Sequence, residues 1–430
     1  MIFKKFLALS LALATLLSLA ACGEKSLKAF NEKPTTETTV LSAQDESAIT
    51  IDPVEYVDGN VELNVHYETS ASDARTVSLV AISVNGVTMH VPFLAESEAG
   101  ESISQKISIP QNDLRLRGIF GLSTIDLLFT IADETSTITD TLSTQIKTSA
   151  AKRYKTDDKA YLQIVTGKKT QKELGYTVVN SITEQPTALG YDVSLKSQVF
   201  VNAGDNEYLL LEVANEGDAM RYVQIGTSSV NGMFTDGAIE NCTILPGTKA
   251  VFALDMNAAL PAAVRDAFGM DGIATVELSC DVYGYTENGE IDWDESGEYT
   301  DFTYNNPERS VTMDLSGTEI YNKHGLKISA KSPVEQVVGD EVKETYVYLI
   351  IENTGNVGYT VLPKSGGETV VGGDSNFLYF DNPGFIGEGD IVISHLMAEN
   401  MTGQQVIMPL YLQPNNGAEG ILRIKLEIPF

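Results

Sequence analysis

The chain repeats parts of its own sequence at fixed distances, and these repeats limit its fold more than any other feature. Two stretches that begin at Thr183 and Thr318 share the pattern T-E-x5-G-x2-[VI]-S-x-K-S. A second offset places Val84-Asn85-Gly86 over Val230-Asn231-Gly232. Fixed offsets of this kind predict tandem units of common ancestry, and here they predict three.

The predicted secondary structure of these units is mainly β. Apolar and polar residues alternate with a period of two, as in half-buried strands, and turn residues separate the runs. The clearest runs are 61–67, 208–213, 275–283, 346–351 and 422–428. The best helical stretch is 260–268, because Pro261 suits a first turn and Gly269 a stop. Short strands with frequent turns predict antiparallel two-sheet β-sandwiches of immunoglobulin-like (Ig-like) architecture.

The amino terminus has the charge and hydropathy order of an export signal. Lys4 and Lys5 precede an apolar run that is short for a membrane span and ends in Leu19-Ala20-Ala21-Cys22-Gly23. This ending resembles the bacterial lipoprotein box, which implies cleavage before Cys22 and attachment of a diacylglyceryl group, with acyl chains such as palmitate, to its thiol. The alternative is an ordinary signal peptide with Cys22 as a bystander. Two acyl chains would hold the protein on the extracellular face of the cell membrane, since each buried CH₂ contributes roughly 0.8 kcal/mol.

The length of 430 residues is too great for one hydrophobic core, since single cores stop growing at roughly 250–300 residues. The predicted segments are a lipoprotein signal peptide at 1–21, a flexible tether at 22–47, a first sandwich at 48–150, a basic connector at 151–173, a second sandwich at 174–317 and a third sandwich at 318–430. If the sandwiches share one ancestry, Val193 should superpose on Ile328, and Asn215 on Asn353.

From residue 48 onward, the order of strand, Asn-Gly turn, second turn and closing strand resembles tandem Ig-like repeats in surface lipoproteins of Firmicutes. The stretch from Gly204 to Asn215 also resembles an Ig-like extracellular module of secreted bacterial proteins. The third unit departs from the pattern, because Gly366-Gly367 replaces the Asn-Gly pair. Members of both groups mostly lack an assigned activity, so the resemblance implies a fold and a location but no chemistry.

The net charge of −30 argues against a nucleic-acid binder, because phosphate contacts need the opposite balance. One basic stretch, 147–172, departs from this acidic background. An anionic partner, such as a wall polymer or an acidic neighbouring domain, is one interpretation of this stretch, and a solvated connector is the other. The predicted contacts are Lys152, Arg153, Lys155, Lys168 and Lys169.

Two further groups of residues carry chemical hypotheses. Cys242 and Cys280 fall in one unit outside the cytoplasm, so they form either a disulfide or two separate core thiols. The stretch that begins at Asp292 follows the first half of an EF-hand-type calcium loop but lacks the second half, so an acidic, solvated hairpin loop is the alternative to a Ca²⁺ site. The candidate ligands are Asp292, Asp294, Ser296 and Glu298. Trp293, the only tryptophan, could contact a partner or cap the domain edge, and we favour the cap.

The sequence shows no compact catalytic constellation. We therefore expect a lipid-anchored surface protein that acts as a non-catalytic binding or structural module, with wall polymer, glycan or a surface protein as its partner. One alternative is a wall-active hydrolase that uses scattered carboxylates, which a pocket of convergent Asp or Glu with raised pKa would favour. Another is a solute-binding lipoprotein, but its two α/β lobes disagree with the strand pattern.

The first prediction concerns the anchor. Replacing Cys22 with Ser removes the thiol that would carry the lipid, so the protein should move from the membrane fraction to the medium. Fractionation of cells followed by immunoblotting measures this. A Cys22→Ser protein that stays fully membrane-bound would contradict the lipoprotein interpretation.

The second prediction concerns the basic stretch. If it binds an anionic partner, charge reversal at Lys152, Arg153 and Lys155 should weaken retention on cell-wall preparations. The loss should shrink between 0.01 and 0.15 M salt, over which the Debye length falls from about 30 to 8 Å. If neither charge reversal nor salt changes the retention, the stretch does not bind an anionic partner and is a solvated connector.

Overall fold

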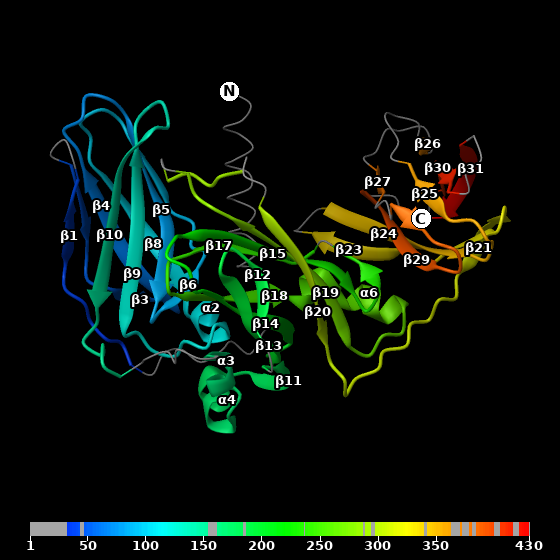
Figure 1. The fold of residues 1–430 in the computed structure, drawn as a ribbon, viewed down its shortest axis with the longest axis horizontal. Helices are drawn as coiled ribbons and strands as arrows, with labels where there is room; N and C mark the ends of the chain where they lie inside the picture. The colour runs from blue at the N-terminus through cyan, green and yellow to red at the C-terminus, as the bar shows by residue number, and fades with distance from the viewer. Residues whose placement is uncertain are drawn as a thin grey trace. The chain divides into compact units, whose positions relative to one another are not determined.

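The computed structural model describes residues 32–43, 47–153, 161–183, 186–235, 237–286, 289–293, 297–338, 342–362, 370–371, 378–380, 384–399, 405–415 and 421–429. The protein is mainly β, and its strands pair mostly antiparallel in a β-sandwich architecture, as predicted (Figure 1). It divides into two compact units. Unit 1 is Met1–Ile225, Glu240–Asp255 and Cys280–Thr300, and unit 2 is Gly226–Ile239, Met256–Ser279 and Asp301–Phe430. Below, residues 48–150, 174–317 and 318–430 are called the first, second and third repeats.

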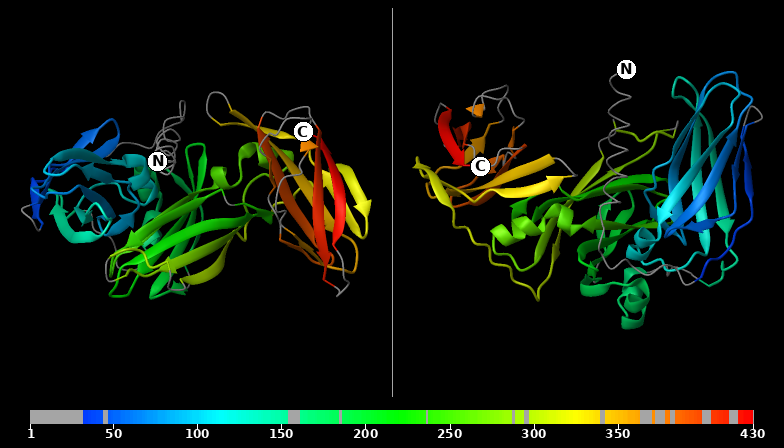
Figure 2. Two further views of the ribbon diagram at one scale, coloured as in Figure 1. Left: turned by 90° about the horizontal axis from the view of Figure 1, so that it is seen from above. Right: turned by 180° about the vertical axis from the view of Figure 1, so that it is seen from behind.

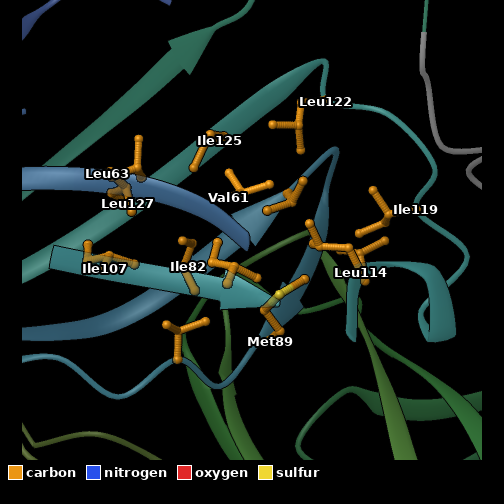
Figure 3. Close-up of a cluster of buried hydrophobic side chains, with 14 of the residues drawn as sticks. Val61, Leu63, Ile82, Met89, Ile107, Leu114, Ile119, Leu122, Ile125 and Leu127 are labelled. Atoms are coloured by element: carbon orange, nitrogen blue, oxygen red, sulfur yellow. The ribbon is translucent and has the colours of Figure 1, made fainter. Parts of the chain in front are cut away.

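The first repeat and the strand before it contain β1 (Thr39–Ser42), β2 (Ala48–Ile51), β3 (Glu55–Val57), β4 (Asn60–Glu68), β5 (Arg75–Val84), β6 (Val87–Met89), β7 (Leu94–Ser97), β8 (Ile103–Pro110), α2 (Gln111–Leu116), β9 (Thr124–Ala132) and β10 (Ile138–Lys147). One layer has the order β1-β2-β4-β3, with β8 also on β4, and the other contains β10-β9-β5-β6, with β7 on β5. Alternate residues of both layers point inward and form one core. Figure 3 shows Leu63 and Ile107 of the first layer beside Ile82 and Leu127 of the second.

Strand β1 lies inside the segment that the sequence predicted to be tether. It pairs antiparallel with β2, from Thr39 opposite Ile51 to Ser42 opposite Ala48. The prediction of a tether up to residue 47 is therefore wrong for these four residues. As an edge strand β1 is largely solvated, with Val40 exposed, and it lacks the apolar alternation that marks a buried strand.

The connector and the second repeat contain α3 (Tyr161–Val165), α4 (Lys168–Leu174), β11 (Thr177–Ile182), β12 (Thr187–Gly190), β13 (Val193–Ala203), β14 (Asn206–Asn215), β15 (Arg221–Val230), β16 (Met233–Phe234), β17 (Ile239–Ile244), β18 (Lys249–Asp255), α5 (Met256–Ala259), α6 (Ala262–Ala267), β19 (Thr275–Tyr283) and β20 (Glu298–Asn305). The predicted helix is confirmed as α6, which begins after Pro261 and ends before Gly269.

The third repeat contains β21 (Thr318–Lys323), β22 (Leu326–Ala330), β23 (Val334–Val338), β24 (Val342–Asn353), β25 (Tyr359–Val361), β26 (Val370–Val371), β27 (Leu378–Phe380), β28 (Phe385–Ile386), β29 (Ile391–Glu399), β30 (Gln405–Pro414) and β31 (Leu422–Pro429). Its sheets have the orders β21-β22-β24-β29-β27, with β23 on β24, and β26-β30-β25-β28, with β31 on β30. The two layers are visible in Figure 2, and residues such as Ile328, Leu349, Leu410 and Leu426 fill the core between them.

The three repeats share the strand order of one sheet, and the first two also share that of the other. The order β10-β9-β5-β6 of the first repeat matches β20-β19-β15-β16 of the second, and β7 and β17 occupy the same side position. The order β2-β4-β8 likewise matches β13-β14-β18 and β22-β24-β29. This agreement supports the common ancestry that the sequence offsets predicted.

An asparagine ends the same strand in the second and third repeats. The Asn215 Nδ2 atom donates to the Ala219 and Ile244 carbonyls, and its Oδ1 accepts from the Gly217 amide. Asn353 makes the corresponding bonds to residues two and four positions further on and to Gly387. The predicted equivalence of Asn215 and Asn353 therefore agrees with the hydrogen bonding.

The predicted equivalence of Val193 and Ile328 differs from the observed register by two residues. Val193 pairs with Asn215, whereas Leu326 pairs with Asn353. Strand β13 also contains a bulge between Leu195 and Ser197 that β22 lacks, and neither difference can be seen in a residue pattern.

The Asn-Gly turns of the first two repeats are built alike. Asn85 and Asn231 both have positive φ, 55° and 52°, as the tight two-residue hairpin turn requires. Asn231 Oδ1 accepts hydrogen bonds from the amides of Ala274 and Thr275 at 2.8 and 3.2 Å, and Asn85 Oδ1 does the same for Ser123 and Thr124. Each side chain thereby fixes the start of β19 or β9 against the hairpin.

The second strand of the β5–β6 hairpin joins the sheets of the first and second repeats. Strand β6 pairs antiparallel with β5 and parallel with β18, so a continuous ten-stranded sheet extends from the first repeat into the second. Near this join, the Arg117 guanidinium donates to both carboxylate oxygens of Glu240 at 2.9 and 3.1 Å. In unit 2 the corresponding hairpin strand, β16, lies against β29 of the third repeat.

The basic connector is partly folded, whereas one interpretation of the sequence was a fully solvated connector. The fully buried Glu212 carboxylate accepts hydrogen bonds from the Tyr161 and Leu162 amides, at 2.5 and 3.0 Å, and thereby holds the start of α3. The Lys249 ammonium lies 3.2 Å from the same carboxylate and balances its charge. Tyr161 also donates through its hydroxyl to the Gly118 carbonyl.

We predict that Asn231→Ala loosens the start of β19. The change removes the acceptor for the amides of Ala274 and Thr275, and each unsatisfied group costs about 1–3 kcal/mol. Hydrogen exchange of these two amides should accelerate by roughly 30-fold, which corresponds to about 2 kcal/mol. Asn322→Ala, at an exposed asparagine, is the control. Unchanged exchange at Ala274 and Thr275 would refute this role of Asn231.

Candidate functional site

Three aromatic side chains, Tyr222, Tyr283 and Trp293, gather on the outer face of the second repeat and are called the aromatic cluster. Tyr222 on β15 and Tyr283 on β19 point away from the core, because their neighbours Val223 and Val282 are buried. Their ring centroids lie 6.4 Å apart. The Trp293 ring meets Tyr222 at 5.5 Å and Tyr283 at 4.9 Å, both in T-shaped contacts. Such geometry is favourable between aromatic rings and supports the indole from two sides.

Trp293 is held by its loop and still faces solvent. The loop between β19 and β20 closes on itself through a bridge between Tyr285 and Ile291, and the Trp293 amide donates to the Ile291 carbonyl at 3.1 Å. The indole side chain nevertheless remains 60% exposed. The edge cap favoured from the sequence accounts for the contacts with the two tyrosines, and the exposure leaves ring surface for a partner.

Two neighbours shape the support beneath the indole. A Cβ atom on Gly297 would lie 2.6 Å from Cε1 of Tyr283, so this position needs glycine to let the loop backbone approach the ring. The Tyr285 hydroxyl hydrogen-bonds that of Thr243 at 2.5 Å. Burial raises the pKa of Tyr285 to about 12, so the phenol stays neutral at ordinary pH.

The calcium hypothesis stays a prediction. Asp294 and Ser296 lie outside the described residues. The Glu298 side chain packs against Gly190, where a Cβ atom would clash with its carboxylate. Across the described part of the chain, no three His, Cys, Asp or Glu side chains gather in a way that could hold a metal ion.

Cys242 and Cys280 are buried free thiols, so of the two predicted arrangements the structure contains the two separate core thiols and not the disulfide. Cys242 is on β17 and Cys280 on β19, and β15 lies between these strands in the sheet. Two strand spacings amount to about 9.6 Å, beyond the roughly 7 Å that a disulfide can span. Burial raises the pKa of both thiols, that of Cys280 to about 12, so neither is a reactive thiolate.

The basic residues that were predicted to contact an anionic partner lie in different surroundings. Lys152 and Arg153 are exposed, and Arg153 forms an ion pair with Glu32. Lys168 and Lys169 are exposed on α4. Lys155 lies outside the described residues, as does the lipidation candidate Cys22. No helix within the described ranges is long and apolar enough to cross a membrane.

Sequence reasoning found Trp293 but missed Tyr222 and Tyr283. The alternation of β15 and β19 could have placed both tyrosines on the outer face. Their closeness to each other depends on the pairing of β15 with β19, and their contact with Trp293 depends on the path of a fourteen-residue loop between β19 and β20. A residue pattern carries neither kind of information.

No known protein family and no curated protein matches the chain. The solved structures similar to it include Amycolatopsis orientalis exo-chitosanase CsxA, with 8% identity over 93% of this chain and 79% of that one and a TM-score of 0.15. A 1.5-MDa bacterial ice-binding adhesin has 10% identity over 93% and 98% of the two chains and a TM-score of 0.16. The BSP domain of a biofilm-associated protein has 8% identity over 95% and 99% and a TM-score of 0.14. Likenesses with such low TM-scores carry no argument about function, so the site is interpreted from its own geometry.

Proposed function

We propose that the chain is a lipid-anchored protein of the extracellular cell surface that binds carbohydrate through the aromatic cluster, without catalysis. The observation that carries the proposal is the Trp293 indole, which rests on two tyrosines and remains 60% exposed. An exposed aromatic ring that its neighbours hold in place is a typical anchor of a binding surface.

Carbohydrate suits this surface for a physical reason. The C–H groups on one face of a pyranose ring are weakly positive, and the face of an aromatic ring is negative, so the two stack. Because T-shaped contacts from the tyrosines hold the indole in place, little side-chain entropy remains to be lost when a sugar binds. The predicted anchor at Cys22 would place this surface outside the cell, where glycans occur.

The sole tryptophan gives a direct test. Titration with chitohexaose, cellohexaose or laminarihexaose should change the intrinsic fluorescence in a saturable way for at least one sugar. In calorimetry, Trp293→Ala should weaken binding of that sugar by roughly 30-fold, since loss of an anchoring tryptophan costs about 2 kcal/mol or more. Chromatography of the incubated sugar should reveal no shorter products.

Phe385→Ala is the matched control, because Phe385 is half exposed and lies in the third repeat. It should bind the sugar as the original protein does. Equal binding by the Trp293→Ala protein, or fluorescence that none of these sugars alters, would refute the proposal. Release of shorter sugars would favour the hydrolase alternative.

A further inference from the structure

A groove of about 650 Å³ lies between two edge strands of the third repeat, β21 and β31. Strand β21 pairs with β22, and β31 pairs with β30. Four of the residues that line the groove carry side chains with nitrogen groups, Lys323, His324, Arg423 and Lys425. All four are exposed.

The charge of this groove opposes that of the repeat around it. Residues 318–430 contain 7 Lys and Arg and 14 Asp and Glu, and three of the seven basic side chains line the groove. The one acidic residue of its lining, Glu319, accepts a hydrogen bond from Asn322 at 3.1 Å. Lys425 forms an exposed ion pair with Glu427, which an incoming anion could replace at little cost.

The need to prevent unwanted pairing at the sheet edges explains why these residues are charged, but not why the charge is positive. Charged side chains on edge strands oppose unwanted pairing. Acidic residues would serve this purpose as well, and they are twice as numerous in this repeat. A concentration of positive charge therefore indicates a ligand of negative charge.

The spacing of the strands limits the form of that ligand. Some Cα atoms of β21 and β31 lie within 8 Å of each other. A peptide inserted as an extra strand would need about 4.8 Å to each neighbour, or about 9.6 Å in all. The groove therefore offers side chains rather than backbone edges to a ligand.

Arg423 and Lys425 present two cationic groups in a row. Ile424 between them is buried, so both point outward from β31, roughly 7 Å apart along the strand. The Arg423 guanidinium lies 5.5 Å from the centre of the Tyr411 ring, which supports it. Guanidinium groups bind phosphate oxygens in pairs, and ammonium groups bind them as point charges.

We propose that this groove binds a phosphodiester-linked polymer, with successive phosphates at Arg423 and Lys425 and further contact from Lys323. This site is separate from the aromatic cluster and does not depend on the sugar binding proposed above.

The test uses the intact chain and a poly(glycerol phosphate) oligomer in calorimetry at 50 mM salt. The double variant Arg423→Glu, Lys425→Glu should bind at least tenfold more weakly, and Lys323→Gln roughly threefold more weakly. Binding by the original protein should also weaken as salt rises to 200 mM. Circular dichroism melting of each variant checks that it folds.

The charge-matched control is Lys33→Glu, Lys106→Glu, at two exposed lysines outside both the groove and the basic stretch, which should change affinity less than threefold. A loss in this control that equals or exceeds the loss in the groove variant would overturn the proposal, because the polymer would then respond to the charge of the whole chain and not to this groove. Poly-glutamate of equal charge that binds as tightly as the phosphate polymer would overturn the assignment to phosphate. Absence of binding to the original protein would overturn the site itself.

Discussion

The structure depends on one asparagine at the Asn-Gly turn of each of the first two repeats, which is buried in the first repeat and partly buried in the second. The Asn231 side chain accepts from two successive amides at the start of β19 and donates to the Gly272 carbonyl, so it sets the position of β19 beside β15. Those two strands carry Tyr283 and Tyr222, which support Trp293. A hairpin turn thus controls the geometry of a surface at the other end of the same strands.

The corresponding Asn85 has a second consequence, because the strand after its turn, β6, pairs both with β5 of its own hairpin and with β18. The residue directly after the helix that precedes β9 or β19 differs between the first and second repeats. Arg117, after α2, forms a charged pair with Glu240, whereas Phe268, after α6, packs on Tyr348 at 5.4 Å and lies under the Lys331 ammonium. One backbone architecture therefore accepts either a charged or an aromatic contact at this position, provided that each partner is satisfied.

The internal offsets predicted much of the fold, since a strand that ends in Asn-x-Gly or Asn-Gly needs the same hydrogen bonds wherever it occurs. What the sequence could not show follows from long-range pairing. Cys242 and Cys280 share a core face, but only the strand order reveals that β15 separates them. The burial of Tyr161 and Leu162 in a basic, polar stretch depends on Glu212, about fifty residues away. At the site, Trp293 was identifiable by its type, whereas its two tyrosine supports depended on sheet pairing and on the path of a loop.

The central claim is that the exposed face of Trp293 binds a sugar. Because the chain has one tryptophan, its indole N–H gives a single side-chain peak in a ¹H–¹⁵N NMR spectrum, which reports on this ring alone. Addition of the oligosaccharide that binds most tightly should shift this peak in a saturable way, with the same Kd as calorimetry. An oligosaccharide that binds while the indole peak stays in place would contradict the account, because the sugar would then occupy another surface.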